Sequence, residues 1–379
     1  MGILQKIIQD TDTSKYGFNE QNAFARIKIC KTEAIEGYYK SKCVDPKCDT
    51  IKMNYQSCRN RSCECGFKKR EEWNHKLVSE MYPVKHFHTT MTMPHELNPI
   101  YLWNKKEFTN IIMKSSRIAL MIKIKEKWKC KSGGTAIFHS WGSDLKVHPH
   151  VHMIVPAGGI CLKTNKWKSF KQEYIANDKA LGNEFRRIFI RELKLSMKKG
   201  KITIPPEIGY IAMNAADLLD FINKLHANTW RVKSKKNSGG DAQVVKYLGR
   251  YSNRVAISSS RIKSYKNGLV TFQYKDYKNN KMDCEKTVLA SEFVKSFSKH
   301  IPEKGVVKCR HFGICSGVSK KNYLAPARIF AYGKNEKSVE IIKEAWKIQN
   351  RIDKVIARAS CCLDCGAEVE IVIPLKDSA

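Results

Sequence analysis

The sequence predicts an α+β fold with a cysteine-rich module at the N-terminal end, and three observations lead to this class. Residues 84–93, 135–139, 145–156 and 261–286 carry the apolar and β-branched patterns typical of strands. Residues 104–128, 178–198 and 215–230 repeat apolar side chains at helical spacing, which predicts helices that cover a sheet. Six cysteines fall in the first eighty residues, at positions 30, 43, 48, 58, 63 and 65.

The charge of the chain indicates a polyanionic partner. The 379 residues include 69 Lys and Arg against 36 Asp and Glu, a formal net charge of +33. A charge of this size suits nucleic acid, and it also suits an anionic membrane surface. We find no apolar run near the length of a membrane span and no leader with an apolar core, so we expect no membrane partner and a soluble, cytoplasmic protein associated with the nucleoid.

The length exceeds that of one typical domain, and we expect three parts. These are a zinc-binding and DNA-binding module at 1–80, a catalytic domain at 81–300, and a helical C-terminal segment at 301–379 in which 335–359 fits a long helix. The chain has fourteen cysteines in tight groups and no export signal, which favours metal binding over disulfides.

The N-terminal cysteines have a spacing that suits a structural zinc ion. Cys43-x4-Cys48 and Cys58-x4-Cys63-x-Cys65 flank a short strand-like stretch at 51–55, which brings two thiolate pairs together as one tetrahedral site needs. The alternative is free buried thiols, which the polar surroundings disfavour. The spacing leaves open which four residues bind, because three cysteines compete for two places and His75 is within range.

The strand predicted at 84–93 places apolar and polar side chains on opposite faces. Phe87, Met91 and Met93 share one face, and Pro94 ends the strand. The other face carries His86, His88, Thr90 and Thr92.

Three histidines at 148, 150 and 152 lie on one face of the strand predicted at 145–156. Two imidazoles on one rigid strand are suited to bind a transition metal, with one or two further ligands from elsewhere. His150 and His152 are the candidate ligands, whereas His148 precedes a proline at the strand end and is expected outside the site. The alternative is a run of surface histidines. We expect His86, His88, His95 and His139 to have structural or supporting roles rather than to bind the metal.

A second informative element is the helix predicted after Gly239-Gly240-Asp241, from 242 to about 255. Gln243, Tyr247 and Tyr251 follow one another at a spacing of four residues, so they share a helix face. A basic stripe of Lys246, Arg250 and Arg254 runs beside them. Paired tyrosines are also common in cores and basic stripes on solvated helix faces, and both alternatives stay open here.

Together the two elements fit metal-assisted phosphoryl transfer to tyrosine. A phenol is a weak nucleophile at neutral pH, so a cation on His150 and His152 would have to polarise the phosphorus. The Gln243 carbonyl oxygen can complete the metal shell, and the basic stripe can hold neighbouring phosphates. Imidazoles with an amide or water suit Mn²⁺ or Mg²⁺, and zinc also fits. Tyrosines one turn apart permit two successive strand transfers.

At this point the residues match a known family. His-Pro-His-Val-His-Met-Ile-Val-Pro at 148–156, after Phe-His-Ser-Trp-Gly at 138–142, resembles the HUH motif of rolling-circle transposases of the insertion-sequence-ninety-one type. Residues 247–258 are similar to the two-tyrosine helix of that family. Supporting matches are Met-Pro-His-Glu-Leu-Asn at 93–98, Ser-Cys-Arg-Asn-Arg at 57–61 and Arg-His-Phe-Gly at 310–313.

The resemblance implies an HUH-endonuclease palm, an antiparallel sheet flanked by helices, that forms a 5′-phosphotyrosine link to single-stranded DNA at hairpin-bearing transposon ends. His150 and His152 carry over as ligands of a divalent cation, and Tyr247 and Tyr251 as nucleophiles; Gln243 is the third ligand by comparison with related HUH enzymes. The resemblance also implies an N-terminal zinc module that binds DNA, in which Arg59 and Arg61 are the candidate contacts.

The cysteine pattern departs from that family. The first spacing is longer, the last is Cys63-x-Cys65, and Ser62 stands where a histidine is common. The terminal Cys362-x2-Cys365 is half a metal site, for which Cys309 and Cys315 are candidate partners.

Three other functions compete with a DNA-nicking transposase. They are a zinc-finger DNA-binding protein without catalysis, a rolling-circle replication initiator or relaxase, and a metal-dependent hydrolase, for which more carboxylates than Asp144 are expected near the histidines. The sequence leaves the oligomeric state open, with a dimer as one option.

Overall fold

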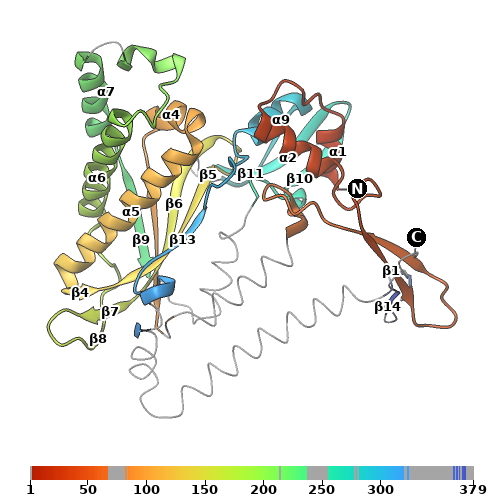
Figure 1. Ribbon diagram of the computed structural model, residues 1–379, viewed down its shortest axis with the longest axis horizontal. Helices are drawn as coiled ribbons and strands as arrows, with labels where there is room; N and C mark the ends of the chain where they lie inside the picture. Colours follow the sequence, from red (N-terminus) through yellow and green to blue (C-terminus); the bar gives the residue numbers. More distant parts are fainter. Residues whose placement is uncertain are drawn as a thin grey trace.

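The computed structural model describes residues 2–66, 82, 84–212, 215–236, 255–276, 279, 281–319, 322–323, 362, 364–365, 367 and 369–372. Within these residues the protein is a mixed α+β structure with antiparallel sheets, which confirms the predicted class (Figure 1). The helix predicted at 242–255 lies outside the described residues except for Val255, and the helix predicted at 335–359 lies outside them entirely.

A five-stranded sheet forms the centre of the larger part of the molecule. Its order is β13 (Cys309–Gly313), β5 (Gly133–Trp141), β6 (Val147–Pro156), β3 (His86–Thr92) and β9 (Arg231–Lys236). All four neighbouring pairs are antiparallel, and a turn closed by the Gly142 N–H and the Lys146 carbonyl joins β5 to β6. The predicted strands at 84–93, 135–139 and 145–156 are therefore confirmed, whereas β9 was not predicted.

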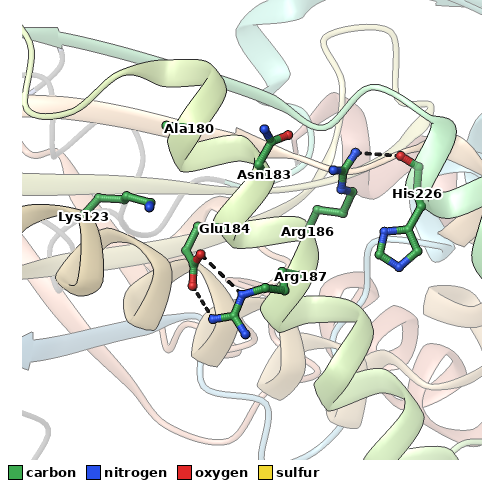
Figure 2. Close-up of a pocket in the computed structure, with 7 residues that line it drawn as sticks. All are labelled: Lys123, Ala180, Asn183, Glu184, Arg186, Arg187 and His226. Atoms are coloured by element: carbon green, nitrogen blue, oxygen red, sulfur yellow. Dashed lines mark hydrogen bonds and ion pairs between the residues drawn. The ribbon is translucent and has the colours of Figure 1, made fainter. Parts of the chain in front are cut away.

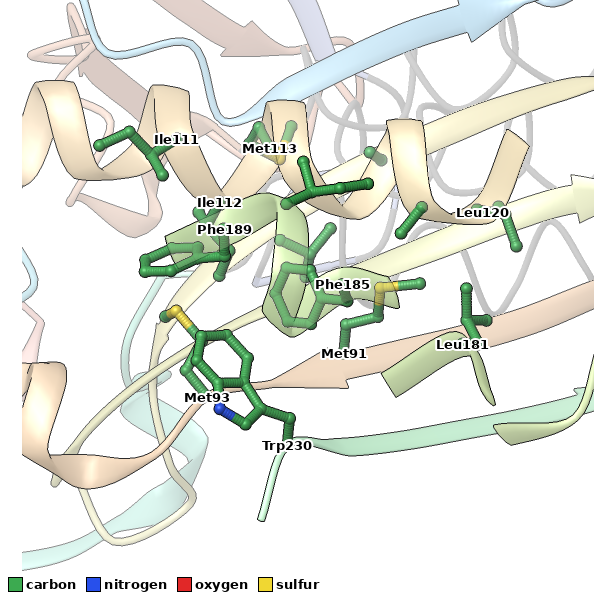
Figure 3. Packing of buried hydrophobic residues seen from close by; sticks show 14 of the residues in the cluster. Met91, Met93, Ile111, Ile112, Met113, Leu120, Leu181, Phe185, Phe189 and Trp230 are labelled. Atoms are coloured by element: carbon green, nitrogen blue, oxygen red, sulfur yellow. The ribbon is translucent and has the colours of Figure 1, made fainter. Parts of the chain in front are cut away.

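Helices cover one face of this sheet. They are α4 (Asn98–Trp103), α5 (Lys105–Trp128), α6 (Asp178–Lys198) and α7 (Ala215–Ala227). Met91 of β3 packs with Ile112 of α5 and with Phe185 and Phe189 of α6 in one cluster of buried side chains (Figure 3). The Asn177 side chain accepts a hydrogen bond from the Ala180 N–H and caps α6 at its predicted start. The apolar faces predicted from periodicity thus form this core.

A second core lies beside the central sheet and combines N-terminal helices with elements from residues 262–298. It contains α1 (Ile3–Gln9), α2 (Phe18–Lys28), α9 (Ala290–Ser298) and the sheet of β10 (Ile262–Lys266), β11 (Leu269–Asp276) and β12 (Lys281–Leu289) (Figure 1). Phe24, Phe272, Phe293 and Phe297 are its largest fully buried side chains. The strands at 261–286 were predicted, and α1 and α2 were not.

Two small sheets and four short helices complete the described elements. One sheet joins β1 (Tyr38–Cys43), β2 (Ile51–Tyr55) and β14 (Val369–Val372), and the other joins β4 (Cys130–Lys131), β7 (Gly158–Cys161) and β8 (Trp167–Ser169). The 3-10 helices are η1 (Glu64–Gly66), η2 (His95–Leu97), η3 (Pro206–Ala212) and η4 (Ser259–Arg261). The division into three parts at 80 and 300 stays a prediction. None of the helices in the described part of the chain has both the length and the apolar character needed to span a membrane.

Candidate functional site

Three histidines meet on the face of the central sheet opposite to the helices. His150 and His152 project from β6 on one face because side chains alternate along a strand. His139 of β5 lies directly opposite His150 in the strand register. One ring nitrogen of each histidine lies within 4.8 Å of those of the other two, and all three side chains are buried. Histidines from two strands thus form one cluster with the spacing of a metal site.

Hydrogen bonds orient the two β6 rings. The Nδ1–H of His150 donates to the His148 carbonyl oxygen at 2.6 Å, and Nδ1 of His152 lies 3.0 Å from Nε2 of His88 and 3.2 Å from Oγ1 of Thr90. Both Nε2 atoms therefore point inward, 3.0 Å apart. Two nitrogens that bind one ion at about 2.1 Å and at a right angle are separated by about 3.0 Å, so this pair fits a divalent cation.

Burial keeps the rings of His150 and His88 neutral. It lowers the pKa of His150 from 6.5 to about 4 and lowers the pKa of His88 to about 4. A neutral imidazole has a free lone pair on the nitrogen that carries no hydrogen, which is the form that binds a metal. At neutral pH His150 is therefore ready to bind without losing a proton.

His139 belongs to the cluster although the sequence predicted a supporting role for it. Its ring stacks on Trp141 with centroids 4.6 Å apart and an interplanar angle of 14°, and it meets the His152 ring edge-on. The sequence alone does not show that β5 pairs with β6 in the register that brings position 139 opposite position 150. The Phe-His-Ser-Trp-Gly match was the signal that could have identified it.

The predicted two-tyrosine helix cannot be compared with this cluster. Gln243, Lys246, Tyr247, Arg250, Tyr251 and Arg254 all lie outside the described residues, as does His75.

A row of cations lies on the same face of the sheet as the histidines. Residues directly opposite one another on antiparallel strands project to the same side. His150 is opposite Thr92, which is opposite Arg231, and His152 is opposite Thr90, which is opposite Lys233. Arg231, Lys233 and Lys235 of the edge strand β9 are all exposed. The sheet therefore presents three cations beside the histidine cluster, a feature that the sequence analysis missed.

The cysteines form two groups, and this corrects the prediction of one site built from both N-terminal pairs. Cys58, Cys63 and Cys65 meet Cys30, which the prediction left out, whereas Cys43 and Cys48 meet Cys362 and Cys365 from the C-terminal end. The four Sγ atoms of each group lie within 4.8 Å of one another. Cys309 and Cys315, the expected partners of the terminal pair, belong to neither group.

The group of Cys30, Cys58, Cys63 and Cys65 lies at the edge of the second core. Cys58 Sγ is 3.6 Å from Cys65 Sγ, and the Cys58 N–H donates to Cys30 Sγ at 3.4 Å. Hydrogen bonding to Cys30 lowers the pKa of the Cys65 thiol and raises those of Cys58 and Cys63, so a cation is needed for all four to ionise together. Four converging sulfurs with N–H donors are the donor set of a structural zinc ion.

The two arginines predicted to contact DNA differ in their surroundings. Arg59 is exposed and has a positive φ of 52°. The Arg61 guanidinium donates to the Val306 and Glu303 carbonyl oxygens, so it links the cysteine module to the segment that precedes β13.

A hollow of about 400 Å³ lies in the helix layer, between α5, α6 and α7 (Figure 2), and none of the three clustered histidines lines it. Glu184 and Arg187 pair with each other at its edge, and Arg186 donates to the His226 carbonyl oxygen. Its charged groups are thus largely used within the protein, and it offers no arrangement for catalysis.

Comparisons with known proteins agree with the geometry. Residues 133–322, half of the chain, match a family model described as "Putative transposase", and residues 3–93 match one described as "Transposase zinc-binding domain". The chain is 27% identical over 313 residues to "Putative transposase y4qJ" of Sinorhizobium fredii, covering 82% of this chain and 77% of the relative. It is 26% identical over 317 residues to "Transposase for insertion sequence element IS801" of Pseudomonas savastanoi pv. phaseolicola, covering 80% and 72%. No solved structure matches the chain significantly.

The two matched regions contain most of the clustered metal-binding side chains. The zinc-binding match includes all four cysteines of the first group together with Cys43 and Cys48, and the transposase match contains all three clustered histidines. The resemblance found in the sequence is therefore confirmed, and the chain belongs to the family of transposases of the insertion-sequence-ninety-one type, with a transposase zinc-binding domain at its N-terminal end.

Proposed function

We propose that this transposase nicks and rejoins single-stranded DNA at transposon ends by transferring a phosphoryl group to tyrosine at the histidine cluster. The observation that carries the proposal is the convergence of His139, His150 and His152 on one face of the central sheet. This sheet, with helices on its other face, is the element that we assign to the HUH palm. Among the described residues, no carboxylate belongs to this cluster. Such a site suits an enzyme whose nucleophile comes from a side chain rather than from a metal-bound water.

The cluster would hold Mn²⁺ or Mg²⁺ through His150 and His152, with His139 as a third ligand from the neighbouring strand. When bound there, the cation would withdraw charge from a non-bridging phosphate oxygen. Gln243 stays an alternative third ligand. His88 and the His148 carbonyl keep the two β6 rings in the orientation in which Nε2 points into the site.

Tyr247 and Tyr251 are the proposed nucleophiles. The phenol oxygen of one tyrosine attacks the phosphorus and loses its proton, the bond from phosphorus to the 3′ oxygen breaks, and that oxygen leaves as a hydroxyl. The 5′-phosphotyrosine keeps the energy of the ester, so a later 3′ hydroxyl can reverse the reaction and join a different strand. Lys246, Arg250 and Arg254 are proposed to bind phosphates beside the nucleophiles.

The DNA strand is proposed to run along the edge strand β9, where it follows the row of Arg231, Lys233 and Lys235. These exposed cations share a face with the histidines, and they are within two strands of His150 and His152 in the sheet order. Cations at the spacing of alternate strand residues can follow a phosphate backbone without reading its sequence. The cysteine module, with exposed Arg59, is proposed to add contacts to DNA and to hold structural zinc.

A nicking assay tests the reaction. Purified protein is incubated with labelled single-stranded oligonucleotides from the transposon ends and Mn²⁺ or Mg²⁺, then resolved on a denaturing protein gel. We expect a labelled protein band that requires metal and disappears in the Tyr247→Phe/Tyr251→Phe double variant. Cleavage without a labelled protein would refute the tyrosine mechanism, and DNA binding without cleavage under any metal would favour the DNA-binding protein without catalysis.

A metal titration separates the two candidate third ligands. His139→Ala is expected to weaken Mn²⁺ binding, measured by calorimetry in the absence of DNA, and Gln243→Ala to leave it unchanged. The matched control is His226→Ala, which removes an exposed histidine from the helix layer. If Gln243→Ala weakens binding and His139→Ala does not, His139 is a positioning residue instead.

The salt dependence of DNA binding tests the row of cations. Each phosphate contact to a single strand contributes about 0.7 to the slope of log affinity against log salt, so loss of three contacts should reduce the slope by about 2. The variant Arg231→Ala/Lys233→Ala/Lys235→Ala is compared with Lys224→Ala, which lies on α7 in the helix layer and pairs with Asp220. An unchanged slope in the triple variant would remove these residues from the DNA path.

A further inference from the structure

The second cysteine group joins the two ends of the chain. Cys43 ends β1 and Cys48 follows in the turn before β2, whereas Cys362 and Cys365 come from the C-terminal end. Cys43 Sγ is 3.4 Å from Cys365 Sγ, and Cys48 Sγ is 3.7 Å from Cys362 Sγ. Each short distance therefore connects residues more than 300 positions apart in the sequence.

These distances fit sulfurs around one zinc ion. Ligands at about 2.3 Å in a tetrahedron are separated by about 3.8 Å, close to the two measured separations. A disulfide needs an S–S distance of about 2.05 Å, and all four cysteines are free. Tight turns present both pairs, since Cys48 N–H donates to the Asp45 carbonyl and Cys362 N–H donates to the Ala367 carbonyl.

Backbone and side-chain contacts around the group hold the ends in register. β14 pairs with β1 in antiparallel fashion, with Cys43 opposite Val369 and Lys40 opposite Val372. The Thr50 hydroxyl donates to Asp364 Oδ2 at 2.8 Å. The C-terminal end thus adds a third strand to the N-terminal hairpin (Figure 1).

Among the side chains that the structure describes, this small sheet shares no apolar core with the rest of the protein. None of the apolar clusters formed by the described residues includes a residue of β1, β2 or β14. Several of its large apolar side chains are exposed instead, among them Tyr38, Tyr39, Ile51 and Met53. Sheets of this size without a core generally depend on a metal ion or a cross-link.

We propose that Cys43, Cys48, Cys362 and Cys365 bind a second structural zinc ion, which fastens the C-terminal end of the chain to the N-terminal hairpin. The two family models end at residues 93 and 322, so neither assigns a role to the terminal pair. The site is independent of the catalytic proposal, because none of its ligands belongs to the histidine cluster. The two zinc ions then stabilise different parts of the protein. The ion at the group of Cys30, Cys58, Cys63 and Cys65 supports the second core, and the ion proposed here holds β14 against β1.

Zinc content of the full-length protein tests this proposal. We expect two zinc ions per chain by elemental analysis in the wild type and in the control Cys309→Ser/Cys315→Ser. Cys43→Ser/Cys48→Ser and Cys362→Ser/Cys365→Ser should each hold one, and the variant with all four substitutions should also hold one, because each pair alone destroys the same site. The zinc ion retained at the first group would report that the remainder of these variants is folded.

Hydrogen exchange provides a second measurement. Cys362→Ser/Cys365→Ser should speed hydrogen exchange of the β1 amides at 40–43. The control variant Cys309→Ser/Cys315→Ser should leave their exchange unchanged. One zinc ion in the wild type, two in Cys362→Ser/Cys365→Ser, or iron in place of zinc would each overturn the proposal.

Discussion

Replacing His88 with alanine should weaken metal binding at the histidine cluster without removing a ligand. Nε2 of His88 lies 3.0 Å from Nδ1 of His152, and the lowered pKa of His88 leaves it neutral and able to accept the Nδ1–H. That hydrogen bond fixes the tautomer of His152 in which Nε2 carries the lone pair. A side chain that hydrogen-bonds to a metal ligand in this way contributes about 10–100-fold to metal affinity, or about 1.4–2.8 kcal/mol.

Thr90 allows the expected loss to be placed within that range. Its hydroxyl lies 3.2 Å from the same Nδ1 and can accept the hydrogen bond when His88 is gone. His88→Ala should therefore lose about 10-fold, and His88→Ala/Thr90→Val about 100-fold. His88→Gln, which keeps an acceptor, should recover most of the affinity.

Calorimetric titration with Mn²⁺ at neutral pH measures these affinities, and His226→Ala serves as the surface control. A purely structural role for His88 would lower the melting temperature in His88→Ala and His88→Gln alike and leave the binding constant of the folded fraction unchanged. That result, or an affinity equal to that of the wild type in the double variant, would refute the reasoning.

Three further predictions concern stability. Phe185→Ala removes a fully buried ring from the main core and should cost about 3–5 kcal/mol in urea unfolding, whereas Leu195→Ala on the exposed face of the same helix should cost less than about 0.5 kcal/mol. Gly133→Ala should cost about 1–3 kcal/mol, because a Cβ there would overlap a carbonyl oxygen of β13, and Gly209→Ala, with open space around it, should be tolerated. Burial lowers the pKa of His300 from 6.5 to about 4, so the unfolded chain takes up its proton first and stability should fall as the pH decreases from about 6.5 to 4. His300→Gln should reduce that slope of the unfolding midpoint against pH; an unchanged slope would show that His300 does not contribute.

The sequence predicted the elements whose side chains repeat with a clear period. α6 begins and ends at the predicted residues because Leu181, Phe185, Ile188 and Leu193 follow one buried face. β9 was missed because an edge strand that alternates Arg and Lys with Val232 and Ser234 resembles a polar loop. The periodicity of apolar residues shows which side of a segment faces the core. An exposed edge strand such as β9 has few apolar residues and therefore a weak pattern.

The partners of the metal-binding residues were harder to predict than the residues themselves. His150 and His152 were identified from one strand, but His139 joins them through the register of two strands. The cysteines were identified as metal ligands, but Cys43 and Cys48 find their partners more than 300 residues away. Spacing in the sequence constrains only ligands that lie within one turn or one strand, and the sheet pairing that unites distant pairs has no local signature.

Trp141 connects the zinc-binding domain to the histidine cluster. Its ring stacks on His139, and it is also a member of the second core, in which Cys30, Cys58 and Cys63 are buried. The same core holds Leu145 in the turn between β5 and β6, whose carbonyl accepts a hydrogen bond from His300. Loss of the first cysteine group would therefore loosen the packing that positions the His139 ring. The zinc-binding domain therefore has a role beyond the DNA contacts proposed for it, because the packing it shares with the turn between β5 and β6 helps to keep the three histidines together.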